Sequence, residues 1–232
     1  MLYLDVALIS ASITGFENPT IPYLDKTICL DEILVHSPSS MRVVNSPNRL
    51  ISRGIQKGDW LIINSSLIPS GDDVILVSID DTWGVSNLHQ VEKIADGREV
   101  NVVGVVQQSV HFYRNAPTVP EHETLKDISL HRTLVELEYA TVLTKASGES
   151  MLPFVRSGDL LIVERHLNRE TDDVCVFALN GDLVLKRYNP LTGALTSDNP
   201  TFMPTRLNSC DQISHEGVVN KVIQMHRLIC SA

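Results

Sequence analysis

The chain has 232 residues, of which 43% are hydrophobic and 20% charged, a composition typical of a globular protein and unlike that of a disordered one. Its net charge is −9 and its basic residues are scattered, so we expect no direct binding to nucleic acid. No run of residues approaches the roughly 18 apolar residues of a membrane-spanning helix, so we expect a cytoplasmic protein without membrane contact. The four cysteines lack the spacing of metal ligands, and we expect neither a metal nor a cofactor.

Along the chain, short apolar runs rich in Val, Leu and Ile predict β-strands, and helical periodicity is weak outside 28–36 and 127–136. Asn180-Gly181, between two such runs, predicts a two-residue hairpin turn, because both turn positions need a positive φ. The remaining predicted strands are "WLII" (60–63), "VILVSIDDTWGVSN" (74–87, two strands), "VVGVVQQSVHF" (102–112), "DLLIVE" (159–164), "DDVCVFAL" (172–179), "DLVLKRY" (182–188) and "HEGVVNKVIQM" (215–225). The fold should be mainly β.

Several of these motifs occur twice. Gly58-Asp59 before an apolar run recurs as Gly158-Asp159, an offset of 158 − 58 = 100, and the last strand recurs with Gly104 set against Gly217, an offset of 217 − 104 = 113. A segment with two prolines and little hydrophobic pattern separates the copies. The repeat predicts an N-terminal arm (1–24), a first domain (25–113), a linker (114–124) and a second domain (125–232), the domains being of ordinary size.

Ser150 lies in a polar, turn-prone stretch, "GESMLPFVRSGDLLIVE" (148–164), and Lys186 lies 186 − 150 = 36 residues further on, in a predicted strand. A serine hydroxyl becomes a nucleophile only when a base takes its proton. A lysine drawn out of water loses its ordinary pKa of about 10.4 and can serve as that base. A lone serine in a turn is more often structural, and a lone lysine at a strand end usually reaches water. Periodicity alone does not choose between these interpretations.

Ser150-Met151, Pro153, Gly158-Asp159, Lys186, "TSDNPTF" (196–202) and Gly217-Val218-Val219, in this order and spacing, resemble the self-cleaving domain of the LexA and UmuD family. The resemblance implies two tandem LexA/UmuD-like β domains. In the second, Ser150 would be the nucleophile and Lys186 the general base, and the backbone amides of Glu149 and Ser150 would form the oxyanion hole of an autopeptidase.

The first copy, "TGFENPTIPYLDKTICLDEILVHSPSS" (14–40) onward, is also similar to this family, and to UmuD in particular, but it lacks the residues for the chemistry. Leu50 or Arg49 stands at the nucleophile position. The Ser40-Met41 pair is 58 − 40 = 18 residues before Gly58, too far upstream, and Ser86 stands where the second copy has Lys186. We therefore expect a catalytically inactive first domain.

Family members cut themselves at Ala-Gly or Cys-Gly in an N-terminal arm, and this chain contains neither dipeptide. Thr14-Gly15 occupies the matching place and is the candidate cleavage bond. The dyad could also remain without a substrate in its own chain.

UmuD-like proteins act as homodimers, so two fused copies imply an intramolecular pseudo-dimer. The resemblance implies an accessory role in the SOS response and translesion synthesis, in which the chain binds an error-prone Y-family polymerase subunit and the RecA filament. The alternative is a non-proteolytic interaction module or mobile-element regulator that binds RecA or a LexA-like repressor. Whether the chain is an active enzyme stays open at this point.

Overall fold

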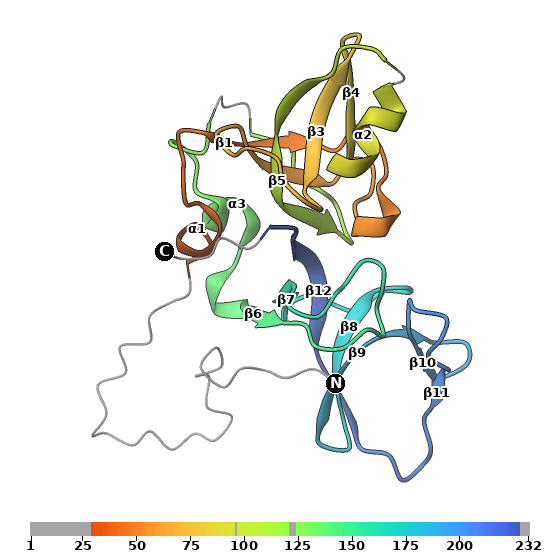
Figure 1. Cartoon of the computed structure of the whole chain (residues 1–232). Helices are drawn as coiled ribbons and strands as arrows, with labels where there is room; N and C mark the ends of the chain where they lie inside the picture. Colours follow the sequence, from red (N-terminus) through yellow and green to blue (C-terminus); the bar gives the residue numbers. More distant parts are fainter. Residues whose placement is uncertain (1–28, 96, 121–123, 228–232) are drawn as a thin grey trace.

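The computed structural model describes residues 29–95, 97–120 and 124–227, and its ribbon forms an upper and a lower body joined by long strands (Figure 1). The upper body is the first half of the chain. Its elements are α1 (Leu30–Leu34), β1 (Met41–Asn45), the 3-10 turn η2 (Ile51–Arg53), β2 (Trp60–Asn64), β3 (Val74–Ile79), β4 (Thr82–Asn87), α2 (Leu88–Ala95) and β5 (Asn101–Phe112).

The lower body is built from the second half of the chain. Its elements are α3 (Leu130–Leu134), η3 (Glu138–Ala140), β6 (Thr141–Lys145), β7 (Leu160–Glu164), β8 (Val174–Leu179), β9 (Asp182–Asn189), β10 (Ala194–Thr196), β11 (Thr205–Arg206) and β12 (Ile213–Met225). The fold is mainly β, as the sequence predicts. No helix in the described ranges has the length and apolar character needed to cross a membrane.

The same strand pairings occur in both halves. Trp60 pairs with Val110 in β2 and β5, and Leu160 pairs with Ile223 in β7 and β12. The offsets are 160 − 60 = 100 and 223 − 110 = 113, the two values of the sequence repeat. The other pairs repeat in the same way: β1 with β2 and β6 with β7, β3 with β4 and β8 with β9, and β3 with β5 and β8 with β12.

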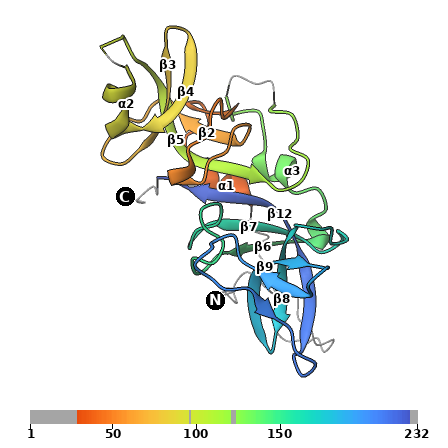
Figure 2. The ribbon, with the colours of Figure 1, turned by 90° about the vertical axis from the view of Figure 1, so that its right-hand side faces the viewer.

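The two halves meet along β5 and β12, which run antiparallel beside each other (Figures 1 and 2). In this ladder Val110 lies opposite Ile223, its own equivalent at the offset of 113. A residue that pairs with its own counterpart marks a local two-fold axis, as in an isologous dimer interface. The ladder thus joins all the strands into one continuous sheet.

Helices α1 and α3 contact each other at this junction and cap each other's N-terminal ends. The amide of Leu30 donates to His131 Nδ1 over 3.2 Å, and the amide of Leu130 donates to Asp31 Oδ1 over 2.6 Å. The first amides of a helix lack intrahelical partners, so a side chain from the other half satisfies each start. The largest buried apolar cluster also takes side chains from both halves, including Trp60, Val110, Leu160 and Ile223.

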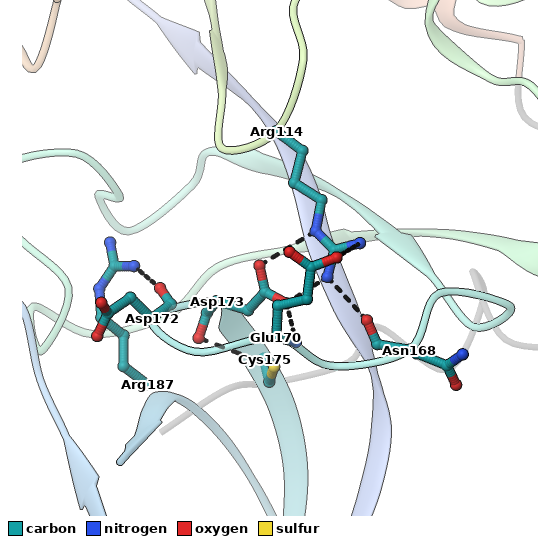
Figure 3. A network of polar contacts seen from close by, with 7 residues as sticks. All are labelled: Arg114, Asn168, Glu170, Asp172, Asp173, Cys175 and Arg187. Atoms are coloured by element: carbon teal, nitrogen blue, oxygen red, sulfur yellow. Dashed lines mark hydrogen bonds and ion pairs between the residues drawn. The ribbon is translucent and has the colours of Figure 1, made fainter. Parts of the chain in front are cut away.

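Two arginines extend this exchange beyond the ends of the long strands. Arg114, after β5, donates through Nε to Asp173 Oδ1 over 3.2 Å and through Nη2 to the carbonyl of Asn168 over 2.8 Å (Figure 3). Arg227, after β12, donates to Asp73 Oδ2 over 2.8 Å and to the carbonyl of Ile68 over 3.3 Å. The two contacts are therefore equivalent: each joins an arginine after a long strand of one half to the aspartate directly before β8 or β3 of the other half.

Two local sequence expectations have clear outcomes. The Asn180-Gly181 hairpin is confirmed, because both residues have positive φ values (53° and 92°) between β8 and β9.

Helix α2 was not predicted. It is a single short helix whose buried Val91 packs with Ile75 and Val77 of the sheet, so tertiary burial stabilises it more than local propensity does.

Replacing Arg114 with Gln should destabilise the protein. Asp173 is 8% exposed and Arg114 21% exposed, so the change leaves a buried carboxylate without its cationic partner. Hydrogen bonds to charged groups of this kind contribute about 2 kcal/mol, and we expect the free energy of unfolding in urea to fall by about that amount. The exposed Arg165 is the matched control, and Arg165→Gln should change it by less than about 0.5 kcal/mol. Equal effects of the two substitutions would contradict a stabilising role of the contact between Arg114 and Asp173.

Candidate active site

Ser150 lies in the loop between β6 and β7, which two buried side chains hold against the second half of the sheet. Met151 and Val155 are each 2% exposed and pack in an apolar cluster with Leu161 and Leu185. The amide of Val155 donates to the carbonyl of Met151 over 3.0 Å and closes a turn directly after the serine. These buried side chains anchor the loop on the sheet, while Ser150 itself stays half-buried.

Lys186 lies on β9, opposite Cys175 of β8. The tight Asn180-Gly181 turn determines this register, because a two-residue hairpin allows one alignment of its strands. Lys186 is half-buried, and burial lowers its pKa from the ordinary value of 10.5 because an ammonium group loses hydration there. The strand therefore presents a lysine that deprotonates more easily than one in water.

Ser150 and Lys186 line the same cavity, of about 120 Å³, although they are 36 residues apart (186 − 150). Apolar side chains of Met151, Val155 and Phe202 form much of the remaining wall. In the described parts of the chain, Ser150 Oγ has no hydrogen-bond partner, whereas Lys186 Nζ donates to Ser197 Oγ over 2.6 Å. The two residues share a cavity without a direct hydrogen bond between them.

Three consecutive residues, Ser197, Asp198 and Asn199, connect the lysine strand to the serine loop. Ser197 binds Lys186, and Asp198 binds the neighbouring Arg187, with its Oδ2 accepting from Nη2 over 3.0 Å. Asn199 donates from Nδ2 to the carbonyl of Glu149 over 2.9 Å and from its amide to the carbonyl of Ser150 over 3.0 Å. The "TSDNPTF" motif marked this segment in the sequence, but nothing local indicated the contact of each residue.

The Asn199 contacts also orient the amide of Ser150. In a planar trans peptide the N–H points opposite to the preceding C=O, so holding the Glu149 carbonyl sets the direction of the Ser150 N–H. Within the described residues, the amides of Glu149 and Ser150 donate to no protein acceptor. An unpaired, oriented amide such as that of Ser150 is the kind of group that an oxyanion hole uses, and the assignment of the Glu149 and Ser150 amides to that role stays a prediction.

Cys175, directly across from Lys186, does not compete as a nucleophile. Its side chain is fully buried, and burial, reinforced by the Asp173 carboxylate, raises the pKa of the thiol to about 12. A thiol reacts as the thiolate, which is scarce at neutral pH with such a pKa. Two serines, Ser147 and Ser150, line the cavity with Lys186, and Ser150 is the one that the sequence motif marks.

In the corresponding region of the first half, Asn48, Val85 and Ser86 line a cavity of about 370 Å³, but no lysine lies at the position equivalent to Lys186. Ser86 lies opposite Ile75, the register position that Lys186 holds opposite Cys175. The amide of Asn48 pairs in both directions with the backbone of Val85, accepting from its N–H over 2.6 Å and donating to its carbonyl over 3.0 Å. Neither a base nor a free strand edge is present at this position.

The other predicted residues of the first half take no part in a comparable cavity. Ser40 precedes β1 and donates to the carbonyl of Ser37 over 3.1 Å. Leu50 forms an isolated bridge with Ile55. The candidate cleavage bond, Thr14-Gly15, lies outside the described residues.

A comparison with family models finds one match that covers the region of this site. Residues 110–220 match the Peptidase S24-like family. The match covers Ser150, Lys186 and the 197–199 segment, and it ends within β12. The second half of the chain is therefore similar to the Peptidase S24-like family, in agreement with the sequence resemblance to the LexA/UmuD type.

Lys186 should titrate below an ordinary lysine. After reductive ¹³C-methylation, we expect the methylamine resonance of Lys186 to titrate with a pKa clearly below those of the other lysines, because burial lowers the pKa of this amine. Loss of that resonance in Lys186→Arg assigns it. A Lys186 signal that titrates at or above 10.5 would contradict a role as base near neutral pH.

Proposed function

We propose that this chain is a serine autopeptidase of the LexA/UmuD type in which Ser150 is the nucleophile and Lys186 the general base. The observation that carries the proposal is the single cavity lined by both residues, inside the region that matches the Peptidase S24-like family. The depressed pKa of Lys186 supports the role of base.

The chemistry follows from these positions. Neutral Lys186 Nζ takes the Ser150 hydroxyl proton while Oγ bonds to the scissile carbonyl carbon, and the amides of Glu149 and Ser150 stabilise the oxyanion. The intermediate collapses when the C–N bond breaks, with Lys186 returning the proton to the leaving amine. Water, deprotonated by Lys186, then hydrolyses the ester and regenerates the serine. The candidate substrate is Thr14-Gly15 in the N-terminal arm.

The two halves act, in this proposal, as a fused pseudo-dimer with one working site. The β5–β12 ladder supports this proposal, and so do the equivalent contacts of Arg114 with Asp173 and of Arg227 with Asp73. Each of these contacts is repeated about a two-fold axis. Fusion keeps the second half at an effective concentration of about millimolar or above, which removes most of the cost of association.

The pseudo-dimer should be a monomer in solution, because the surface that would recruit a second copy is already covered. We expect sedimentation equilibrium to give 25.7 kDa, one chain, across a hundredfold range of concentration. A mass that rises to twice this value with concentration would contradict internal use of the two-fold surface.

The biological role we propose is that of a UmuD-like accessory of the SOS response, which binds an error-prone Y-family polymerase subunit and the RecA filament and supports translesion synthesis. The net charge of −9 favours contact with DNA through such partners rather than directly.

A second candidate is a non-proteolytic module that binds RecA or a LexA-like repressor. It is favoured by one specific observation: within the described residues, no hydrogen bond joins Ser150 Oγ to Lys186 Nζ. The absence of Ala-Gly and Cys-Gly from the chain agrees with it. In this case Ser150→Ala would keep full biological activity.

Self-cleavage separates the two candidates. At raised pH, or with activated RecA filaments at neutral pH, we expect the chain to lose its first fourteen residues, read by intact mass. The rate should rise about tenfold per pH unit below the pKa of Lys186, because the neutral amine is the base, and then level off. First-order kinetics that do not change on dilution would indicate cleavage within one chain.

Ser150→Ala and Lys186→Ala are the controls and should both remain intact. Cleavage that persists in Ser150→Ala would exclude this nucleophile. An intact wild-type chain under both conditions would favour the interaction module.

A further inference from the structure

We infer that Ser197 is a positioning residue for Lys186, and that the segment Ser197–Asn199 acts as a brace that sets the base against the nucleophile. This inference rests on the proposed function and adds a residue to its site. It starts from the hydrogen bond of 2.6 Å between Lys186 Nζ and Ser197 Oγ.

A general base needs a direction as well as a pKa. The lysine side chain has four rotatable carbon–carbon bonds, so an amine at its end is poorly oriented unless something holds it. As acceptor from one N–H of Lys186, Ser197 Oγ restrains the nitrogen at one point and leaves the lone pair of the neutral amine for the Ser150 hydroxyl. The ring centre of Phe202 is also 5.7 Å from Nζ and limits the space around the amine.

The next two residues, Asp198 and Asn199, bind the segment to the lysine strand and to the serine loop. Asp198 holds Arg187, the strand neighbour of Lys186, and Asn199 holds the carbonyls of Glu149 and Ser150. Three adjacent residues thus bind the base, its strand and the nucleophile loop. Because their backbone is continuous, the brace couples the position of Lys186 to that of Ser150.

The first half supports this interpretation by contrast. There β4 leads directly into α2, whereas in the second half β9 leads into β10, β11 and the 197–199 segment. The repeat offset grows from 100 to 113 across this part of the chain, since Leu160 matches Trp60 and Ile223 matches Val110. The brace therefore lies in the part of the chain where the two halves differ most, and it occurs in the half with the proposed dyad.

Ser197→Ala tests the inference in the full chain through two measured quantities, the rate of self-cleavage and its apparent pKa. The plateau rate of self-cleavage at high pH should fall about tenfold or more, because the neutral amine loses its orientation. The apparent pKa of the rate profile should also fall, because Oγ accepts a stronger hydrogen bond from the ammonium than from the amine and its loss disfavours the charged form. A merely structural loss would lower the rate without moving the pKa.

Two variants are controls. Ser197→Thr keeps the hydroxyl and should restore both the rate and the pKa. Thr196→Val removes the adjacent hydroxyl, which contacts the carbonyl of Arg187 and not Lys186, and it should stay within about twofold of wild type. A Ser197→Ala protein with wild-type rate and pKa would overturn the inference.

Failure of the proposed function gives a different result. If the wild-type chain does not cleave itself under any condition, the ¹³C-methylamine titration of Lys186 still reports the contact. Ser197→Ala should then lower that pKa relative to wild type and to Thr196→Val. An unchanged Lys186 pKa in Ser197→Ala would overturn the inference whether or not cleavage occurs.

Discussion

The antiparallel ladder between β5 and β12 is the constraint on which the rest of the molecule depends. Its register places Val110 opposite Ile223, and every exchange between the halves follows from the two-fold axis at that pair. Buried polar side chains flank it: Ser109 Oγ donates to Gln224 Oε1 over 2.9 Å. An apolar ladder could slip by two residues at little cost, whereas this hydrogen bond is satisfied in one register only.

The ladder also links the first half to the candidate active site in the second. The strand β5 continues into Tyr113 and Arg114, which cross to the other half. Arg114 binds Asp173 at the start of β8, and the guanidinium of Arg187 lies 5.4 Å from the centre of the Tyr113 ring. Since Arg187 adjoins Lys186, the first half supports the strand that carries Lys186.

The sequence identified the features that depend on local pattern. The mainly β fold and the Asn180-Gly181 hairpin were predictable because strand periodicity and positive-φ turns are local properties. The Arg114–Asp173 contact joins residues 59 positions apart, and Arg227–Asp73 joins residues 154 apart. No local signal specifies such pairs, because only the completed ladder brings them together. The Ser197 contact was missed for the same reason: a serine in a turn has no preferred partner until the strands are assembled.

The two halves differ at the proposed Ser-Lys site in more than two residues. By the offset of 100, Leu50 corresponds to Ser150 and Ser86 to Lys186, so two substitutions would restore the two functional groups. They would not restore the site. Asn48 already occupies both backbone groups of Val85 on the outer edge of β4. Moreover, α2 follows β4 directly, where the second half has the brace that orients the lysine and the serine loop. The proposed chemistry therefore depends on the framework around Ser150 and Lys186 as much as on the two residues, and the first half has a different framework at the equivalent place.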